Sequence, residues 1–241
     1  MADIFAEVDE AMRQERVEKF WKENGSLILT FVLLTILATA GFSGYRTWDA
    51  KVRATQTDAL IGLLDDPAFP EKALEESALD LRPNLEGLAL LNAAGTLVEQ
   101  GKTDEALAAY SRASENGKIA PEFRDIATLM SVRLLSAQED SDPDMLIEKL
   151  RKITNNAKSP WKYHAHLETA LILAHKRGDY ETARTHLAAI TDAEGLPASL
   201  LSTARSLDHV YALRAQAETK AELETKDESK ADNTQEEEIS Q

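Results

Sequence analysis

The chain has 241 residues, of which 42 are acidic and 27 basic, so its formal net charge is −15, and it contains no cysteine. This acidic balance argues against binding to nucleic acid or electrostatic binding to a membrane surface, because both need an excess of Lys and Arg. The lack of cysteine excludes thiol catalysis and zinc–thiolate sites. It is compatible with an oxidising compartment but does not establish one.

Residues 1–23 are the first segment in chain order, and they carry four Lys or Arg against seven Asp or Glu, a net −3. Some apolar residues recur roughly on one helical face, including Phe5, Val8 and Met12. The segment is therefore either a helix that lies on a membrane or binds a partner helix, or a solvated helix that leads into the next segment.

Residues 24–45 contain no charged side chain. As a helix they would be roughly 33 Å long, and a bilayer hydrocarbon core is roughly 30 Å thick. The dense middle, residues 27–37, is interrupted only by Thr30 and Thr35, whose hydroxyls can bond the backbone of their own helix. The segment predicts one transmembrane helix over 24–45.

Two alternatives compete with the membrane anchor. A buried helix of a soluble core would keep a polar stripe, and none is visible. A secretory signal peptide is the stronger rival, because Ala38-Thr39-Ala40 has the small-x-small form of a cleavage site. The net charge of −3 before the segment and its uncharged continuation to Tyr45 are atypical of a signal peptide. An uncleaved anchor is the better interpretation.

Positive charge predicts the orientation of this helix, with the more basic side in the cytoplasm. Four Lys or Arg lie in residues 1–23 and three lie in residues 46–53. The chain is thus expected to be a single-pass protein with its N-terminus in the cytoplasm and its C-terminal domain outside, which in a bacterium means the inner membrane and the periplasm. Aromatic residues on both flanks are expected to anchor the helix at the interfaces: Phe20, Trp21, Tyr45 and Trp48.

Residues 46–217 are rich in Ala and Leu, poor in aromatics and punctuated by proline, which favours packed helices over a sheet. No segment alternates with period 2. The predicted fold class is all-α. The expected helices are 46–65, 71–81, 85–100, 103–116, 121–138, 143–155, 160–177, 180–192 and 197–217.

Two stretches, 88–117 and 166–195, repeat one pattern of helix, glycine turn and second helix. Gly101 and Ala106 have the same spacing as Gly178 and Ala183, and a large residue follows each alanine after four positions. This spacing is typical of a tetratricopeptide repeat, although its usual Trp, Gly and Tyr are replaced in the first copy by Leu90, Ala94 and Leu97. The residues expected to pack the repeats are Leu90, Ala94, Gly101, Ala106, Tyr110, Gly178, Ala183 and Leu187.

The distance in sequence between the two copies is longer than two tetratricopeptide repeats of about 34 residues each. A degenerate helical pair over about 121–156, with an insertion near 138–142, is expected between the copies. Such an array stacks helical pairs on a shared core and leaves a concave face that can bind protein segments.

Residues 218–241 hold nine acids and three Lys, a net −6, with few apolar residues, so they are expected to form a disordered acidic tail. No catalytic, phosphate-binding or nucleotide-binding motif occurs in the chain. Its five histidines lack the spacing of a metal site and are expected to pack or face solvent. An enzyme, a cofactor, a metal and a small-molecule substrate are therefore not expected.

The residues on both sides of the apolar segment carry a resemblance. The run KFWKENGSLI (19–28) precedes it, GYRTW (44–48) ends it, and degenerate repeats follow. This layout resembles the family of ancillary SecYEG translocon subunits of bacteria, single-span inner-membrane proteins with a periplasmic repeat domain. The resemblance extends to about residue 215 and implies partners among translocon subunits and periplasmic chaperones. The acidic tail is not part of the pattern.

Together these observations predict a membrane-anchored, non-catalytic adaptor whose repeat surface binds a chaperone or a secreted client. One alternative is a scaffold for envelope or division machinery with a single fixed partner. Another is a soluble repeat protein released by cleavage after Ala40.

Overall fold

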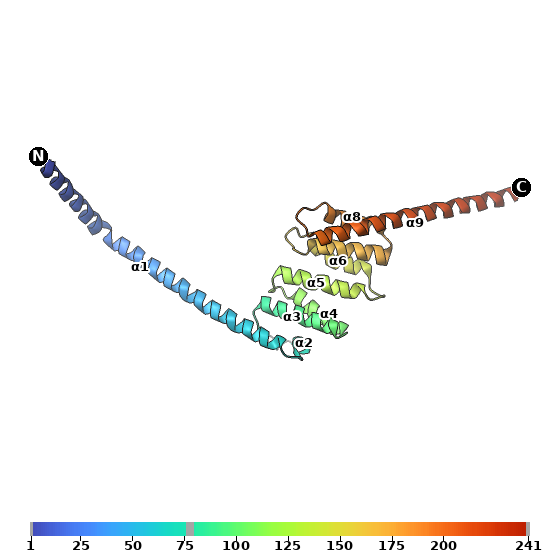
Figure 1. Cartoon of the computed structure of the whole chain (residues 1–241), viewed down its shortest axis with the longest axis horizontal. Helices are drawn as coiled ribbons and strands as arrows, with labels where there is room; N and C mark the ends of the chain where they lie inside the picture. Colours follow the sequence, from blue (N-terminus) through green and yellow to red (C-terminus); the bar gives the residue numbers. More distant parts are fainter. Residues whose placement is uncertain (1, 76–79, 240–241) are drawn as a thin grey trace. The chain divides into compact units, whose positions relative to one another are not determined.

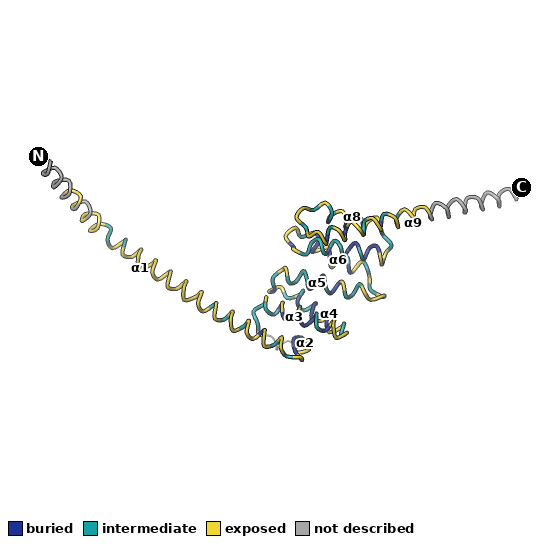
Figure 2. The backbone as a smooth tube through the Cα atoms, viewed as in Figure 1, coloured by how far each residue is buried: buried dark blue, intermediate teal, exposed yellow. Residues whose placement is uncertain are grey.

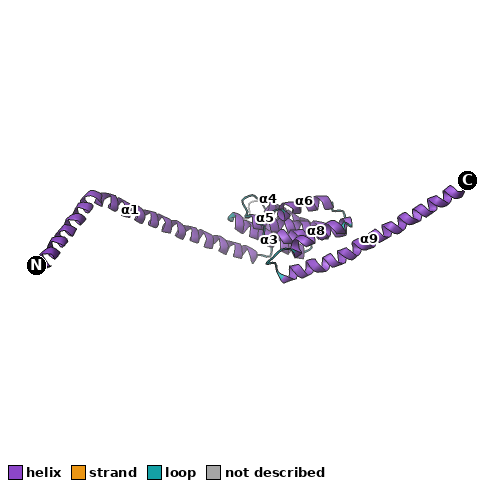
Figure 3. Ribbon diagram, turned by 90° about the horizontal axis from the view of Figure 1, so that it is seen from above, coloured by secondary structure: helices purple, strands orange, loops and turns teal. Residues whose placement is uncertain are grey.

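The computed structural model describes the backbone of residues 2–75 and 80–239, and side chains from Met12 to Lys220 apart from residues 14, 16, 17 and 76–79. The chain divides into two compact units, Met1–Ala59 and Leu60–Gln241. In the described residues the structure consists of helices and the turns between them (Figure 3). The all-α prediction is confirmed.

The first unit consists of most of helix α1 (Ala2–Leu64). The apolar part of α1 is long and hydrophobic enough to cross a membrane, with a mean hydropathy of 2.1, and none of it is buried. A core helix of a soluble protein would be mostly buried, so this alternative has no support in the structure. Figure 2 shows the exposed stretch, in which the Phe31 side chain is 72 % exposed.

Threonines inside the apolar stretch satisfy their own hydroxyl groups. Thr30 donates to the Ser26 carbonyl at 2.7 Å, and Thr35 donates to the Phe31 carbonyl at 2.8 Å. An unsatisfied donor in hydrocarbon would have a cost on the order of several kcal/mol. The predicted span therefore has these polar side-chain groups paired within the helix.

The second unit begins with the last turn of α1 and continues with the short helix α2 (Phe69–Lys72). The longer helices follow in antiparallel pairs along the chain (Figure 1). They are α3 (Pro83–Glu99), α4 (Thr103–Glu115), α5 (Pro121–Ser136), α6 (Pro143–Thr154), α7 (Lys162–Ile172), α8 (Tyr180–Thr191) and α9 (Ala198–Ile239). One turn of π-helix, η1 (Leu173–Arg177), continues α7.

Each pair consists of a first helix (α3, α5 or α7) and a second helix (α4, α6 or α8), and α9 follows as a further first helix. Successive first helices contact one another, α3 with α5 and α5 with α7. The second helices α4 and α6 pack against the first helices on both sides of them. The degenerate pair expected over about 121–156 is present as α5 and α6, with the insertion as the loop between them.

Proline and capping residues start these helices, as the sequence predicts. Proline is the first residue of α3, α5 and α6, where its missing N–H is not needed. The Asp142 carboxylate accepts from the Asp144 backbone N–H at 2.9 Å, and Asp179 accepts from that of Thr182 at 3.0 Å. The turns inside the first and third pairs place Gly101 at φ 75° and Gly178 at φ 66°, a conformation that favours glycine.

The loops that connect one pair to the next repeat a hydrogen-bonded turn that the sequence analysis did not identify. Asn116 Oδ1 accepts from the Lys118 backbone N–H at 3.1 Å, and Asn156 Oδ1 accepts from that of Lys158 at 3.1 Å. This Asx turn reverses the chain before the next first helix.

The prediction of one helix over 71–81 is wrong, because α2 (Phe69–Lys72) ends at Lys72, residues 73–75 form a turn and a bend, and Asp80 and Leu81 are not helical. Residues 76–79 of the expected helix lie outside the described part of the chain. The Arg112 guanidinium on α4 donates to the carbonyl oxygens of Ala73 at 2.9 Å and Glu75 at 3.2 Å. A continuing helix would use these carbonyls for its own hydrogen bonds, so the interaction with Arg112 replaces it.

Helix α9 extends to Ile239 and so passes beyond residue 217, where the sequence analysis ends its last helix. The acidic composition from residue 218 onward offers few apolar groups to hold a helix against a core. Disorder of residues 218–241 stays a prediction.

Small residues let the paired helices approach closely. Six alanines between α3 and α4 are fully buried: Ala89, Ala93, Ala94, Ala106, Ala109 and Ala113. A second cluster joins α5, α6 and α7 around Leu129, Leu146 and Leu150. A third joins α7, α8 and α9 around Leu187, Ile190 and Tyr211. The core is thus continuous along the stack of pairs.

Candidate protein-binding surface

The solvent-facing side of the first helices is the candidate site, and we call it the first-helix surface. On α3, the residues turned away from the packed helices recur every three or four positions. They include Leu88, which is 44 % exposed, and Val98, which is 38 % exposed. An added Cβ at Gly95, between them, would meet no atom within 4 Å, so the helix surface here is open.

At the other end of the stack, helix α9 also has exposed apolar side chains. Its buried stripe, which includes Leu200, Ala204 and Tyr211, packs into the third core cluster. Beside this stripe, Val210 is 46 % exposed and Leu213 is 54 % exposed. Exposed aliphatic side chains on a monomer mark candidate contact sites for proteins.

Between these ends, α5 and α7 are joined by a largely buried carboxylate. Glu168 on α7, 5 % exposed, accepts from Arg133 Nε on α5 at 3.0 Å, and Ser136 Oγ lies 3.5 Å from its second oxygen. A charge-assisted hydrogen bond of this kind fixes the distance between two successive first helices. This ion pair therefore holds α5 and α7 together in the centre of the first-helix surface.

The residues that the sequence singled out for repeat packing lie at the helix contacts. Ala106 and Ala183 are fully buried on the second helices of the first and third pairs, and Tyr110 is 7 % exposed. The others with no exposed surface are Leu90, Ala94 and Leu187. Gly101 and Gly178 form the turns inside these pairs.

The four aromatic residues expected at the membrane interfaces are all exposed on α1, from 59 % for Phe20 to 63 % for Tyr45. Trp21 and Trp48 are each 60 % exposed. The rings of Tyr45 and Trp48 lie 6.3 Å apart, and the other two aromatics precede the apolar stretch. Their role as interface anchors stays a prediction.

The structure brings together two histidines that the sequence analysis treated separately. His166 on α7 and His186 on α8 approach with their Nδ1 atoms 3.0 Å apart. In sequence both are equally far from residue 176, close to the turn at Gly178. Residues at equal distances from the turn of a helical hairpin lie opposite each other, and this spacing could have predicted the contact. Only one nitrogen of the two can carry the shared proton, so the contact requires at least one neutral ring.

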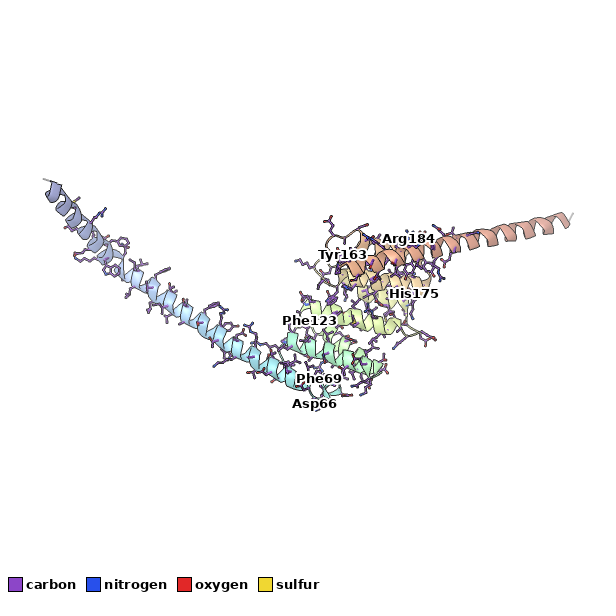
Figure 4. All side chains as sticks on the ribbon, viewed as in Figure 1. Asp66, Phe69, Phe123, Tyr163, His175 and Arg184 are labelled. Carbon is purple, nitrogen blue, oxygen red and sulfur yellow. The ribbon has the colours of Figure 1, made fainter. Side chains whose placement is uncertain are left out.

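Burial, together with smaller effects of the neighbouring His186 and Lys162, lowers the pKa of His166 to about 4, while the Thr154 backbone acts in the opposite direction. Burial also lowers the pKa of His186. Both rings are therefore neutral near pH 7. A second histidine contact joins His175 Nε2 to the Tyr211 hydroxyl at 3.3 Å, and Figure 4 labels His175 on the side of the stack that also carries Arg184.

Within the part of the chain that the structure describes, no group of three or more acidic or histidine side chains could hold a metal ion. One shallow groove of about 470 Å³ lies between α8 and α9, next to the ion pair of Arg184 and Asp208 at 2.8 Å.

One family model matches the chain, the tetratricopeptide repeat-like domain, over residues 18–185. No curated protein and no solved structure matches the chain. The matched segment covers more than half of the 241 residues and contains the apolar part of α1, the first two helical pairs, and the third pair up to the first half of α8. The chain belongs to the tetratricopeptide repeat-like domain family.

Proposed function

We propose that the protein is an inner-membrane adaptor that lies beside a bacterial protein-export translocon and binds periplasmic chaperones or emerging clients through its first-helix surface. Tetratricopeptide-like domains indicate protein–protein interaction. The observation that carries the proposal is that the matched family segment begins at Glu18 and includes the apolar helix together with most of the repeat helices.

The continuity of this segment supports an anchor over a cleaved signal peptide. It passes through the small-x-small site at Ala40 and includes the flanking runs 19–28 and 44–48 on which the translocon resemblance rests. An anchor confines the repeat domain to the membrane and raises its effective concentration toward a membrane partner, up to about millimolar for a short tether.

The exposed aliphatic side chains support binding of a protein segment. Leu88 and Val98 on α3, and Val210 and Leu213 on α9, offer apolar contacts on first helices at both ends of the stack. A helix or an extended chain with apolar side chains could bury these residues, at about 25 cal/mol for each Å² of apolar surface removed from water.

Photocrosslinking in the native membrane tests the proposal. A benzophenone side chain replaces Leu88 on the first-helix surface or Trp48 at the end of the apolar segment, and the matched control replaces Glu105, exposed on the second helix α4. We expect Trp48 to give adducts with translocon subunits and Leu88 to give adducts with a chaperone or nascent clients, with few adducts from Glu105.

Adducts only with division or envelope proteins would contradict the translocon role and favour a scaffold with one fixed partner. A soluble product that begins at Gly41 would contradict the anchor and identify a secreted repeat protein. Equal adducts from Leu88 and Glu105 would contradict the first-helix surface as the binding site.

A further inference from the structure

The first helical pair contains a carboxylate held by two donors from its second helix. Glu86 on α3 accepts from Arg112 Nη2 at 3.1 Å through Oε1 and from Asn116 Nδ2 at 3.3 Å through Oε2. The Glu86 side chain is only 16 % exposed. This acid is thus an internal ligand that satisfies the donors at the end of α4.

The second pair has the same positions with different residues. The first helices α3 and α5 begin at Pro83 and Pro121, and the second helices α4 and α6 follow the capping residues Lys102 and Asp142. Alignment on these starts places Arg124 where the first pair has Glu86, Lys152 where it has Arg112, and Asn156 where it has Asn116. The same Asx turn at Asn116 and at Asn156 supports this register.

Because the second pair has Arg124 where the first pair has Glu86, the donors in the second pair have no carboxylate at this position. Arg124 Nε is buried and has no hydrogen-bond partner among the described residues. The Asn156 side-chain oxygen accepts from the Lys158 backbone, and its amide N–H groups can donate to a further acceptor. A buried donor without a partner costs about 1–3 kcal/mol. Arg124 as a whole is only partly buried.

The aligned position on α6 and the loop after it carry further positive charge. Lys152 and Lys158 are exposed, and no carboxylate among the described residues pairs with either of them. Some basic residues elsewhere in the repeats do have acidic partners, such as Arg133 with Glu168 and Arg177 with Asp144. The sequence from Lys149 to Leu167 contains five Lys or Arg and no acid.

The nearby acids do not fill the position. Asp125, the next residue on α5, accepts from Ser159 Oγ at 2.6 Å, and Glu148 on α6 pairs with Arg151 at 2.8 Å. Trp161 Nε1 donates to the Glu122 carbonyl at 2.9 Å, which holds the loop before α7 against the first turn of α5. Phe123 and Tyr163, labelled in Figure 4, mark the N-terminal ends of α5 and α7 at this edge of the stack.

We propose that Arg124, Lys152 and Lys158 bind a carboxylate side chain from an acidic peptide segment of a partner protein. Glu86 in the first pair shows the chemistry of the occupant, a glutamate-type carboxylate that meets a guanidinium and an amide. The exposed lysines extend the site beyond one carboxylate, which suits a peptide with several acids. This site is separate from the first-helix surface and does not depend on the proposed anchor.

Binding of a defined peptide to the full-length protein in neutral detergent tests the proposal. The probe is a fluorescent peptide of alternating Glu and Ser, and the matched control peptide has Gln in place of Glu. We expect the Glu peptide to bind, the Gln peptide not to bind, and the affinity to fall as NaCl rises from about 50 to about 300 mM, because salt screens exposed charges.

The variant Arg124→Glu should recreate the arrangement of the first pair, with the new carboxylate facing Lys152 and Asn156. We expect it to weaken peptide binding at least about tenfold without lowering the thermal unfolding temperature. Lys152→Gln should weaken binding by a smaller factor. The control Arg205→Glu makes the same charge change at an exposed position on α9 and should leave binding unchanged.

Wild-type affinity in Arg124→Glu, or equal binding of the Glu and Gln peptides, would overturn the site. If Arg124→Glu fails to fold, Arg124→Gln gives the same test without a new charge, and unchanged binding in that variant would also overturn it. Binding to phosphatidylglycerol vesicles that needs Arg124, without peptide binding, would replace the peptide by a lipid headgroup and overturn the proposal.

Discussion

Acidification should destabilise the third helical pair through the contact between His166 and His186. In the folded state burial holds both rings neutral, and in the unfolded chain a histidine has a pKa near 6.5. The unfolded state therefore binds more protons as the pH falls below about 6.5, and the free energy of unfolding decreases. The decrease due to His166 ends below its folded pKa of about 4.

The size of this effect follows from the pKa of His166. A shift from 6.5 to about 4 gives a loss of about 2 kcal/mol between pH 7 and pH 5 for a fully enclosed ring. Since His166 is only half-buried, solvent screening reduces the expected loss to about 1 kcal/mol. Paired carboxylates such as Asp179, whose pKa is lowered by its hydrogen bonds to Thr182, lose their contribution at lower pH.

Urea unfolding of the full-length protein in detergent, followed by circular dichroism at pH 7 and pH 5, measures the loss. The variant His166→Gln keeps a polar side chain but cannot titrate, so its unfolding free energy should fall by about 1 kcal/mol less than that of the wild type over this range. His209→Gln, exposed on α9, is the matched control. Equal pH dependence in wild type and His166→Gln would refute the reasoning.

Other predictions concern packing. Ala106→Asp or Ala183→Asp places a charge in a fully buried helix contact and should lower the unfolding free energy by at least about 2–3 kcal/mol in urea titrations; unchanged unfolding of both would contradict the repeat packing. Gly87→Ala would bring a Cβ within 2.8 Å of the Ile119 side chain, in the loop between α4 and α5, and should lower the melting temperature, whereas Gly95→Ala on the same helix meets no atom within 4 Å and should stabilise by about 0.5–1 kcal/mol; the opposite order would refute the stacking geometry. Arg133→Met removes the charged partner of the largely buried Glu168 carboxylate and should lower the free energy of unfolding by about 2 kcal/mol, as measured by calorimetry. A loss of stability that does not depend on pH would contradict this explanation.

Sequence patterns predicted most of the helices because their signals are local. Pro121 and Pro143 start helices at the expected residues, and Gly101 and Gly178 form the expected turns. The helix expected over 71–81 failed because its carbonyls bind Arg112, which is far away in sequence. A long-range hydrogen bond of this kind leaves no trace in the periodicity of the segment.

The candidate sites were less accessible from the sequence for the same reason. In the sequence alone, nothing distinguishes Arg124 from other residues of its helix. Its position becomes informative only by comparison with Glu86, which accepts from two donors in the first pair. The first helices and the second helices of the pairs recur with different offsets along the chain, so a single repeat length does not align them. Only the paired geometry relates Arg124 to Lys152 and Asn156.

The position of α9 after the third pair has a consequence for local motion. Each inner helix has neighbours on both sides, whereas α9 packs mainly against α8. In a stack whose stability depends on contacts between adjacent units, the outermost helix opens with the smallest free energy. Amide protons in α9 should therefore exchange with solvent before those in α5. A partner that covers Val210 and Leu213 would slow this exchange, so its binding would be detected as protection of the whole last helix.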